Sequence, residues 1–223
     1  MGEGGHEWPW LPPPPGTEGP DVGVGPDPLS ETMRRRLLDQ RVVLLHGRLD
    51  DLAVTRLAAE LMTLDADGDA SVTLRVDCGE AGLAPALTLM DVIELMGVPV
   101  RALCLGQVAA GAIGVVAVCA HRSALPSTRF SLCEPATRHE AHVRNVAQWA
   151  ELQARERRRF CERVGAAVGR PVDTVEADLQ RGRFLGAAEA VGYGIVDEVC
   201  RPEAAVHTLP GAGPPPVGFR PLR

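Results

Sequence analysis

The sequence predicts an α/β fold with mainly parallel sheets, crossover helices and one long helix. Two observations support this class. Short apolar segments of strand length alternate, between residues 41 and 120, with segments that repeat apolar residues at helical spacing. Such alternation is typical of parallel strands joined by helices. The chain has 223 residues, 45% of them hydrophobic, which is enough for one domain with a sizeable core.

The first strand is expected at residues 41–46, a short apolar run. A helix follows, with Asp50 and Asp51 suited to cap its first turn. It carries leucines at helical spacing, Leu57, Leu61 and Leu64. A loop rich in aspartate, at residues 65–69, ends this helix.

The second strand is expected at residues 71–76, where apolar and polar residues alternate with a period of two. Apolar residues then return at helical spacing over residues 86–96, which predicts the second helix. A third strand is expected at residues 98–105. It is followed by a helix of small residues from about residue 109 to residue 120, whose glycines and alanines favour close packing on the sheet.

A long arginine-rich helix is expected over residues 143–168, ended by Gly169 with Pro171 just beyond. Residues 155–159 read Arg-Glu-Arg-Arg-Arg. We interpret this cluster as a solvated face, with pairing to another subunit as the alternative.

Composition argues against several functions. The formal net charge is −6 and the basic residues, all arginine, are scattered, so we expect no nucleic-acid partner. Six cysteines occur without a CxxC pair, which gives no support to a metal or redox site, and no cofactor is expected. No signal peptide or apolar run of membrane-spanning length is present. We therefore expect a cytoplasmic protein with no membrane partner.

Glycine and proline divide the chain into three parts. Residues 1–29 and 204–223 are rich in both, and we expect them to be a disordered N-terminal segment and a C-terminal tail. We interpret Trp8 and Trp10 as incidental residues of this segment, with a role as docking anchors as the alternative. Residues 30–203 are expected to form the one folded domain.

From about residue 36 to residue 201 the chain resembles the ClpP family, the proteolytic subunits of the ATP-dependent Clp protease. Residues 37–44 and 47–51 resemble the family's first strand and its G-x-x-D-D turn. The most specific match is residues 183–199, RFLGAAEAVGYGIVDEV, which follow the family's R-F-x-S-x-x-E-A-x-x-Y-G-L-I-D-x-V ending. Gly186 replaces a helix-capping serine there. The resemblance implies a ClpP/crotonase-like fold with a long handle helix.

The same resemblance implies that the family's catalytic triad is missing. The serine of G-x-x-A-S is matched by Ala110 in residues 106–111. The histidine of L-P-x-S-R-x-x-x-H-x-P is matched by Cys133, and the aspartate between two arginines by Gly182. An alanine methyl cannot attack a carbonyl, and a thiol does not replace imidazole as a base near neutral pH. Neither catalytic residues nor peptidase turnover are expected.

The turn whose backbone amide helps to stabilise the family's oxyanion is also altered. The family's N-S-P-G-G-S reads Asp-Cys-Gly-Glu-Ala-Gly here, with Gly79, Glu80 and Ala81 at its centre. Glu80 places a carboxylate where negative charge would develop, and this opposes oxyanion stabilisation.

The family forms stacked heptameric rings fed by a hexameric AAA+ unfoldase. The resemblance therefore implies a structural or regulatory subunit of a ring, homo-oligomeric or mixed with other ClpP-type subunits, with an unfoldase as a further partner. Two alternatives remain open. One is a peptidase with a relocated nucleophile, either Cys133 with His139 or His142, or Ser131, or Ser127. The other is a crotonase-like acyl-CoA enzyme that uses Glu80 or Glu134. Two histidines have no visible role: we expect His46 to be a core or edge residue and His121 to lie in a surface loop.

Overall fold

The computed structural model describes residues 28–137 and 146–200. The chain divides into two compact units, with the boundary between Arg35 and Arg36. That boundary falls inside the first helix, α1 (Pro28–Asp39). The terminal segments expected to be disordered lie outside the described residues, apart from residues 28 and 29, which begin α1.

A seven-stranded, mainly parallel sheet forms the core of the second unit. Five strands follow one another in the order β1-β2-β3-β4-β7, and every pair among them is parallel. Their bounds are β1 (Val42–Leu49), β2 (Val72–Ala81), β3 (Val100–Ala109), β4 (His121–Ala124) and β7 (Glu198–Val199). The parallel sheet predicted from the sequence is thus confirmed.

Two further strands extend the sheet at the end of β3. Strand β5 (Arg129–Leu132) pairs in parallel with the last residues of β3, and β6 (Arg183–Gly186) pairs antiparallel with β5. Neither strand was predicted from periodicity, because four residues carry too little pattern to identify a strand.

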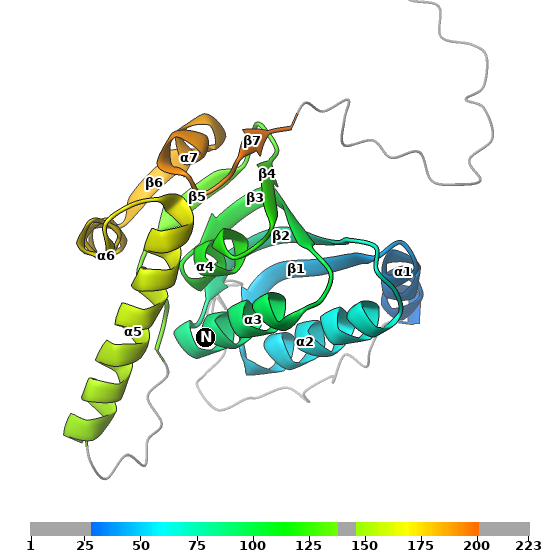
Figure 1. Ribbon diagram of the computed structural model, residues 1–223, viewed down its shortest axis with the longest axis horizontal. Helices are drawn as coiled ribbons and strands as arrows, with labels where there is room; N and C mark the ends of the chain where they lie inside the picture. The colour runs from blue at the N-terminus through cyan, green and yellow to red at the C-terminus, as the bar shows by residue number, and fades with distance from the viewer. Residues whose placement is uncertain (1–27, 138–145, 201–223) are drawn as a thin grey trace, which may run out of the picture. The chain divides into compact units, whose positions relative to one another are not determined.

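Three helices lie along one face of the sheet (Figure 1): α2 (Asp51–Ala66), α3 (Leu83–Leu95) and α4 (Gly111–Ala117). The side chain of Asp50 accepts a hydrogen bond from the backbone N–H of Ala53 at 3.0 Å, so the predicted cap of α2 is confirmed. The three predicted leucines, Leu57, Leu61 and Leu64, are all buried beneath it. The helix expected over residues 109–120 is shorter, since residue 109 ends β3 and a sharp turn precedes α4.

The long predicted helix is α5 (Val146–Val168), which packs on α3, α4 and α6 (Val172–Arg181) (Figure 1). Its expected first residues, 143–145, lie outside the described part of the chain. Gly169 ends it in a left-handed conformation, with φ of +68°. A Cβ at Gly114 of α4 would collide with the Phe160 ring of α5, so glycine permits this close packing. Helix α7 (Ala187–Tyr193) completes the fold.

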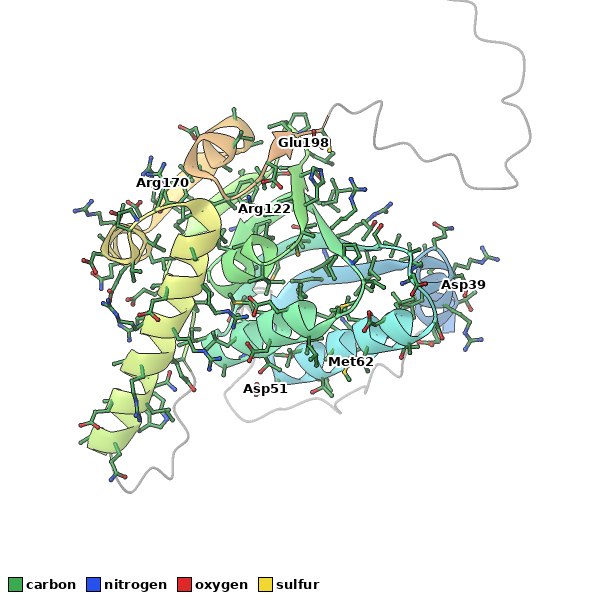
Figure 2. All side chains as sticks on the ribbon, in the orientation of Figure 1. Asp39, Asp51, Met62, Arg122, Arg170 and Glu198 are labelled. Atoms are coloured by element: carbon green, nitrogen blue, oxygen red, sulfur yellow. The ribbon has the colours of Figure 1, made fainter. Side chains whose placement is uncertain are left out.

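The structure corrects one of the two histidine predictions and confirms the other. His121 is not in a loop but begins β4, where its Nε2 lies 3.1 Å from Glu198 Oε1 of the neighbouring β7. Figure 2 shows Arg122 and Glu198 on these two strands. His46 lies on the edge strand β1, and its Nδ1 is 3.4 Å from Asp77 Oδ2 on β2. Both pairs join residues that are distant in the sequence, so no local sequence pattern predicts them.

Candidate functional site

A turn with strained backbone joins β3 to α4 at Ala110. Its backbone has φ of +52° and ψ of −127°, a combination that residues other than glycine rarely adopt. A strained residue between a strand and a helix is the geometry that exposes the nucleophile in many hydrolases. We call Ala109–Gly111 the elbow. Here the elbow carries only a methyl group, and Ala110 is 5% exposed.

Strand β5 brings Cys133 beside the elbow. Ala109 pairs with Ser131 across the two strands, and the backbone N–H of Ala110 donates to the Ser131 carbonyl oxygen at 3.2 Å. The Cys133 backbone N–H donates to the same oxygen at 3.1 Å. Cys133 therefore lies two residues beyond the one that is bonded to the elbow, and it is half-buried.

Strand β6 brings Gly182 to the same place. The antiparallel register of β5 and β6 ends with Leu132 opposite Arg183. Cys133 directly follows Leu132 in the chain, and Gly182 directly precedes Arg183. Gly182 ends α6 in a left-handed conformation, with φ of +71°, and no atom lies within 4 Å of where its Cβ would be. The ladder thus gathers the three positions that the sequence motifs singled out, Ala110, Cys133 and Gly182.

These three positions offer a methyl group, a thiol and no side chain. Ala110 has no lone pair with which to attack a carbonyl, and Gly182 has no carboxylate with which to orient a base. All six cysteines are free. Burial raises the pKa of the Cys119 thiol to about 12 and that of Cys161 to about 11, so these two remain protonated at neutral pH.

The residues predicted to form a degenerate oxyanion turn extend β2, which runs to Ala81. Gly79 lies against the side chain of Gln107, since a Cβ there would be 3.3 Å from Gln107 Oε1. The Glu80 carboxylate is paired with Arg48 of β1 at 3.0 Å, and both side chains are more than half exposed. Glu80 is therefore a surface ion-pair residue at the end of the strand.

A groove of about 630 Å³ opens beside the elbow. Its walls are residues 48–51, residues 82–85, residues 136–137 and three side chains of α5, among them Trp149 and Glu156. The groove adjoins the elbow because the Gly82 carbonyl oxygen lies 2.9 Å from the position of a Gly111 Cβ. Four of its residues are acidic, Asp50, Asp51, Glu80 and Glu156, against the single cation of Arg48.

The backbone on either side of this groove is joined directly. The Leu83 backbone N–H donates to the Ala136 carbonyl oxygen at 3.0 Å, and Gly82 and Ala136 form an isolated parallel bridge. These main-chain groups next to the elbow are satisfied within the chain, so they are not free to pair with an extended peptide.

The alternative nucleophiles lack a base within the described ranges. Ser131 is buried at 6% exposure, and Ser127 is exposed. Neither His46 nor His121 bonds to a serine or cysteine, because their partners are carboxylates. His139 and His142 lie outside the described residues. Glu134, the other alternative acid or base, is paired with Arg157 at 3.3 Å.

A buried polar cluster near Gly182 was not predicted. Asp178 of α6 is 8% exposed and accepts a hydrogen bond from the Tyr193 hydroxyl at 2.9 Å. The guanidinium groups of Arg170 and Arg183 lie 4.1 and 5.5 Å from the centroid of the Tyr193 ring. This cluster joins α6 to α7, the helices on either side of Gly182 in the chain. Asp178 and Tyr193 are 15 positions apart in the chain, and no local sequence pattern predicted their contact.

Metal binding and membrane insertion gain no support from the described residues. Within residues 28–137 and 146–200, no three histidine, cysteine or acidic residues are grouped so that they could hold a metal ion. In the same ranges, no helix is both long enough and apolar enough to cross a bilayer.

Comparison with known proteins places these features in one family. The Clp protease family model matches residues 27–203. The proteolytic subunit 2 of the ATP-dependent Clp protease of Thermobifida fusca is 30% identical over 177 residues, covering 77% of this chain and 86% of that protein. Proteolytic subunit 1 of the ATP-dependent Clp protease of Corynebacterium diphtheriae is 29% identical over 168 residues. The match covers 74% of this chain and 80% of that protein.

Proposed function

This chain belongs to the Clp protease family, and we propose that it acts there as a subunit without peptidase activity, with a structural or regulatory role in a cytoplasmic ring complex. The observation that carries the proposal is the elbow. A backbone geometry suited to presenting a nucleophile is kept at Ala110, while the residue itself has no nucleophilic atom.

The surroundings of the elbow support the same proposal. Cys133 and Gly182, brought beside it by β5 and β6, supply neither an imidazole nor a carboxylate. The Leu83 N–H and the Ala136 carbonyl oxygen, beside the elbow, are bonded to each other and are not free to pair with an extended peptide. Removing all three triad residues of the serine peptidase subtilisin lowers kcat by about a millionfold, so we expect negligible turnover here.

The fold around the site is retained, and this favours a role in assembly over loss of function altogether. The elements that place Ala110, Cys133 and Gly182 remain closely packed, with glycine at the α4 positions where a Cβ would collide. We propose that the partners are ClpP-type subunits, identical or paralogous, and that an AAA+ unfoldase engages the complex. No observation favours the acyl-CoA alternative, since Glu80 and Glu134 are each paired with an arginine.

A peptidase assay tests the missing chemistry. The purified full-length chain is incubated with fluorogenic peptides and an unfolded protein, beside an intact family member. We expect no release above the buffer blank, and no change on Cys133→Ala, Ser131→Ala or Ser127→Ala. Turnover by the wild-type chain that one of these substitutions abolishes would overturn the proposal in favour of a relocated nucleophile.

Co-expression tests the role in assembly. The chain is produced together with an intact ClpP-type subunit from the same cell, and complexes are weighed by native mass spectrometry. We expect this chain in a complex with itself or with that subunit. If the chain is recovered only as a single chain, both when it is produced alone and when it is co-expressed, it is not a ring subunit.

A further inference from the structure

A row of residues crosses the sheet on the face that points away from α2, α3 and α4 (Figure 1). The strand registers align it from β1 to β7: Leu44, Arg75, Leu103, Ser123 and Glu198. Paired residues of neighbouring strands point to the same side of a sheet, so all five belong to one face. Leu44 is 39% exposed, and Arg75 and Leu103 are half-exposed. We call the surface formed by these three side chains the open face, and because parallel sheets are normally covered on both sides, we expect it to have an occupant.

Arg75 determines which occupant fits the open face. Its Nε is buried and has no hydrogen-bond partner among the residues that the structure describes. A buried donor without an acceptor is costly, so a carboxylate placed here would be stabilised by a charge-assisted hydrogen bond. Leu44 and Leu103, on either side of Arg75, offer contacts to apolar side chains. The fitting occupant is therefore a chain segment with an acidic residue among apolar ones.

The last residue that the structure describes, Cys200, lies on the same side of the sheet. Its backbone N–H donates to the Ala124 carbonyl oxygen at 2.8 Å, which continues the ladder of β4 and β7 by one residue. Residues two apart in a strand point to the same side, so Cys200 points to the side of Glu198. The chain therefore leaves β7 at the rim of the open face.

The nine residues that follow have the chemistry that the open face requires. Residues 201–209 read Arg-Pro-Glu-Ala-Ala-Val-His-Thr-Leu. Glu203 is the only acidic residue after Glu198 in the sequence, and Val206 and Leu209 follow it at intervals of three. We call residues 201–209 the return segment.

The return segment is long enough to reach Arg75. Three strand spacings of about 4.8 Å separate Glu198 from Arg75, which is roughly 14 Å across the sheet. The three residues from Cys200 to Glu203 span about 10 Å when extended, and the two long side chains of Glu203 and Arg75 cover the rest.

We propose that the return segment folds back over the open face of its own chain. The Glu203 carboxylate lies beside the Arg75 Nε and supplies the acceptor that this donor lacks, while Val206 and Leu209 cover Leu103 and Leu44. This contact is autoinhibitory, because a partner that needs the open face binds only after it has displaced the return segment. It extends the folded domain past the boundary predicted from the sequence, and it does not depend on the proposed function.

The thiol of Cys200 reports whether the open face is covered. Cys133 and Cys200 are the two half-buried cysteines, whereas the other four are buried. The full-length chain and a chain that stops at Arg201 are treated with iodoacetamide, and alkylation of each thiol is followed by mass spectrometry of peptides. We expect Cys200 to react about tenfold faster in the shortened chain, the factor that one charge-assisted hydrogen bond contributes. Cys133, remote from the return segment in the fold, is the internal control and should react at one rate in both chains.

Substitutions in the full-length chain separate the apolar contact from the acidic one. Val206→Ser and Leu209→Ser leave the charge around Cys200 unchanged, and each should speed its alkylation several-fold. Val217→Ser, which lies beyond the return segment, is the matched control and should have no effect.

A charge exchange tests the pairing of Glu203 with Arg75. Glu203→Arg alone should expose Cys200, and adding Arg75→Glu to that variant should restore the slow rate, because the two charges again attract each other. Circular dichroism checks the fold of each variant. If Arg75→Glu does not fold, the neutral substitutions in the return segment decide the question by themselves.

Three results would overturn the inference. Equal alkylation rates of Cys200 in the full-length and shortened chains would show that the return segment does not cover the open face. A folded exchange variant that stays as reactive as Glu203→Arg would show that the two charges are not paired. Protection of Cys200 that is lost when the chain is diluted would place the segment on a second copy. None of these measurements involves peptide turnover, so the proposed function stands or falls separately.

Discussion

The backbone N–H of Ala110 donates to the carbonyl oxygen of Ser131 at 3.2 Å, and this bond ties the elbow to the end of β5. It holds a non-glycine residue at a positive φ of 52°. Strain of this kind persists where surrounding structure enforces it, and it is most common at catalytic sites. Here the strain remains although the side chain at the elbow has no chemistry to perform.

Ala110→Gly is therefore expected to stabilise the protein. Glycine adopts a positive φ without penalty, and relief of strain of about 1–3 kcal/mol exceeds the added entropy cost of about 0.5–1 kcal/mol. We expect the free energy of unfolding to rise by about 1 kcal/mol, measured by urea denaturation. Ala112→Gly in α4 serves as the control and should lower it by a similar amount, because Ala112 is in an ordinary helical position. Equal losses in both variants would contradict a strained elbow.

Restoring the serine alone should not restore activity. In Ala110→Ser the hydroxyl has no imidazole at Cys133 and no carboxylate at Gly182 to activate it, so we expect no release of a fluorogenic peptide above the blank. The triple variant Ala110→Ser, Cys133→His, Gly182→Asp should show measurable turnover. Gly182 has open space around its Cβ position, and aspartate tolerates the left-handed backbone better than most residues. Activity of the single variant would reveal a base elsewhere.

Tyr193 should titrate far above the ordinary range for a tyrosine. Burial, with the hydrogen bond to Asp178 as the next cause, raises the pKa of Tyr193 to about 12. Because the raised pKa favours the neutral phenol in the folded state, its contribution to stability is complete below pH 10, the ordinary pKa, and is lost as the pH rises towards 12. Tyr193 is the only tyrosine of the chain, so the near-ultraviolet absorbance of tyrosinate reports it alone.

Two variants check that assignment. Asp178→Asn should lower the pKa of Tyr193 while leaving it above 10, since the larger cause, burial, remains. In Tyr193→Phe the loss of stability between pH 10 and 12 should be smaller than in the wild type, as followed by thermal unfolding across this range. A tyrosine that titrates at pH 10 in the folded protein would show that Tyr193 is neither buried nor bonded to Asp178.

Two glycines in helices should respond to alanine in opposite directions. At Gly114 of α4 a Cβ would collide with the Phe160 ring and lie 2.8 Å from the Met90 sulfur, so Gly114→Ala should cost about 1–3 kcal/mol of stability. At Gly192 of α7 no atom lies within 4 Å, and Gly192→Ala should add about 0.5–1 kcal/mol through helix propensity. Denaturant titration compares the two, and a neutral Gly114→Ala would mean that α4 and α5 are not closely packed.

Local features were predictable from the sequence because their causes lie within a few residues. The Asp50 cap of α2 and the Gly169 end of α5 each depend on neighbours in the chain, and both are confirmed. The apolar periodicity that predicted β1, β2, β3 and their helices is also a property of adjacent residues. The short strands β4, β5, β6 and β7 carry too few residues to show a period, and they were not predicted.

The sequence by itself determined the chemistry available at three positions: a methyl group at Ala110, a thiol at Cys133 and no side chain at Gly182. Only the tertiary structure decided that these three positions flank the ends of paired strands, because the β3, β5 and β6 ladders join segments separated by many residues. It also decided that Arg75 of β2 lies between Leu44 of β1 and Leu103 of β3. No tight turn joins these strands, so their register depends on how the buried faces of the strands pack together across the sheet.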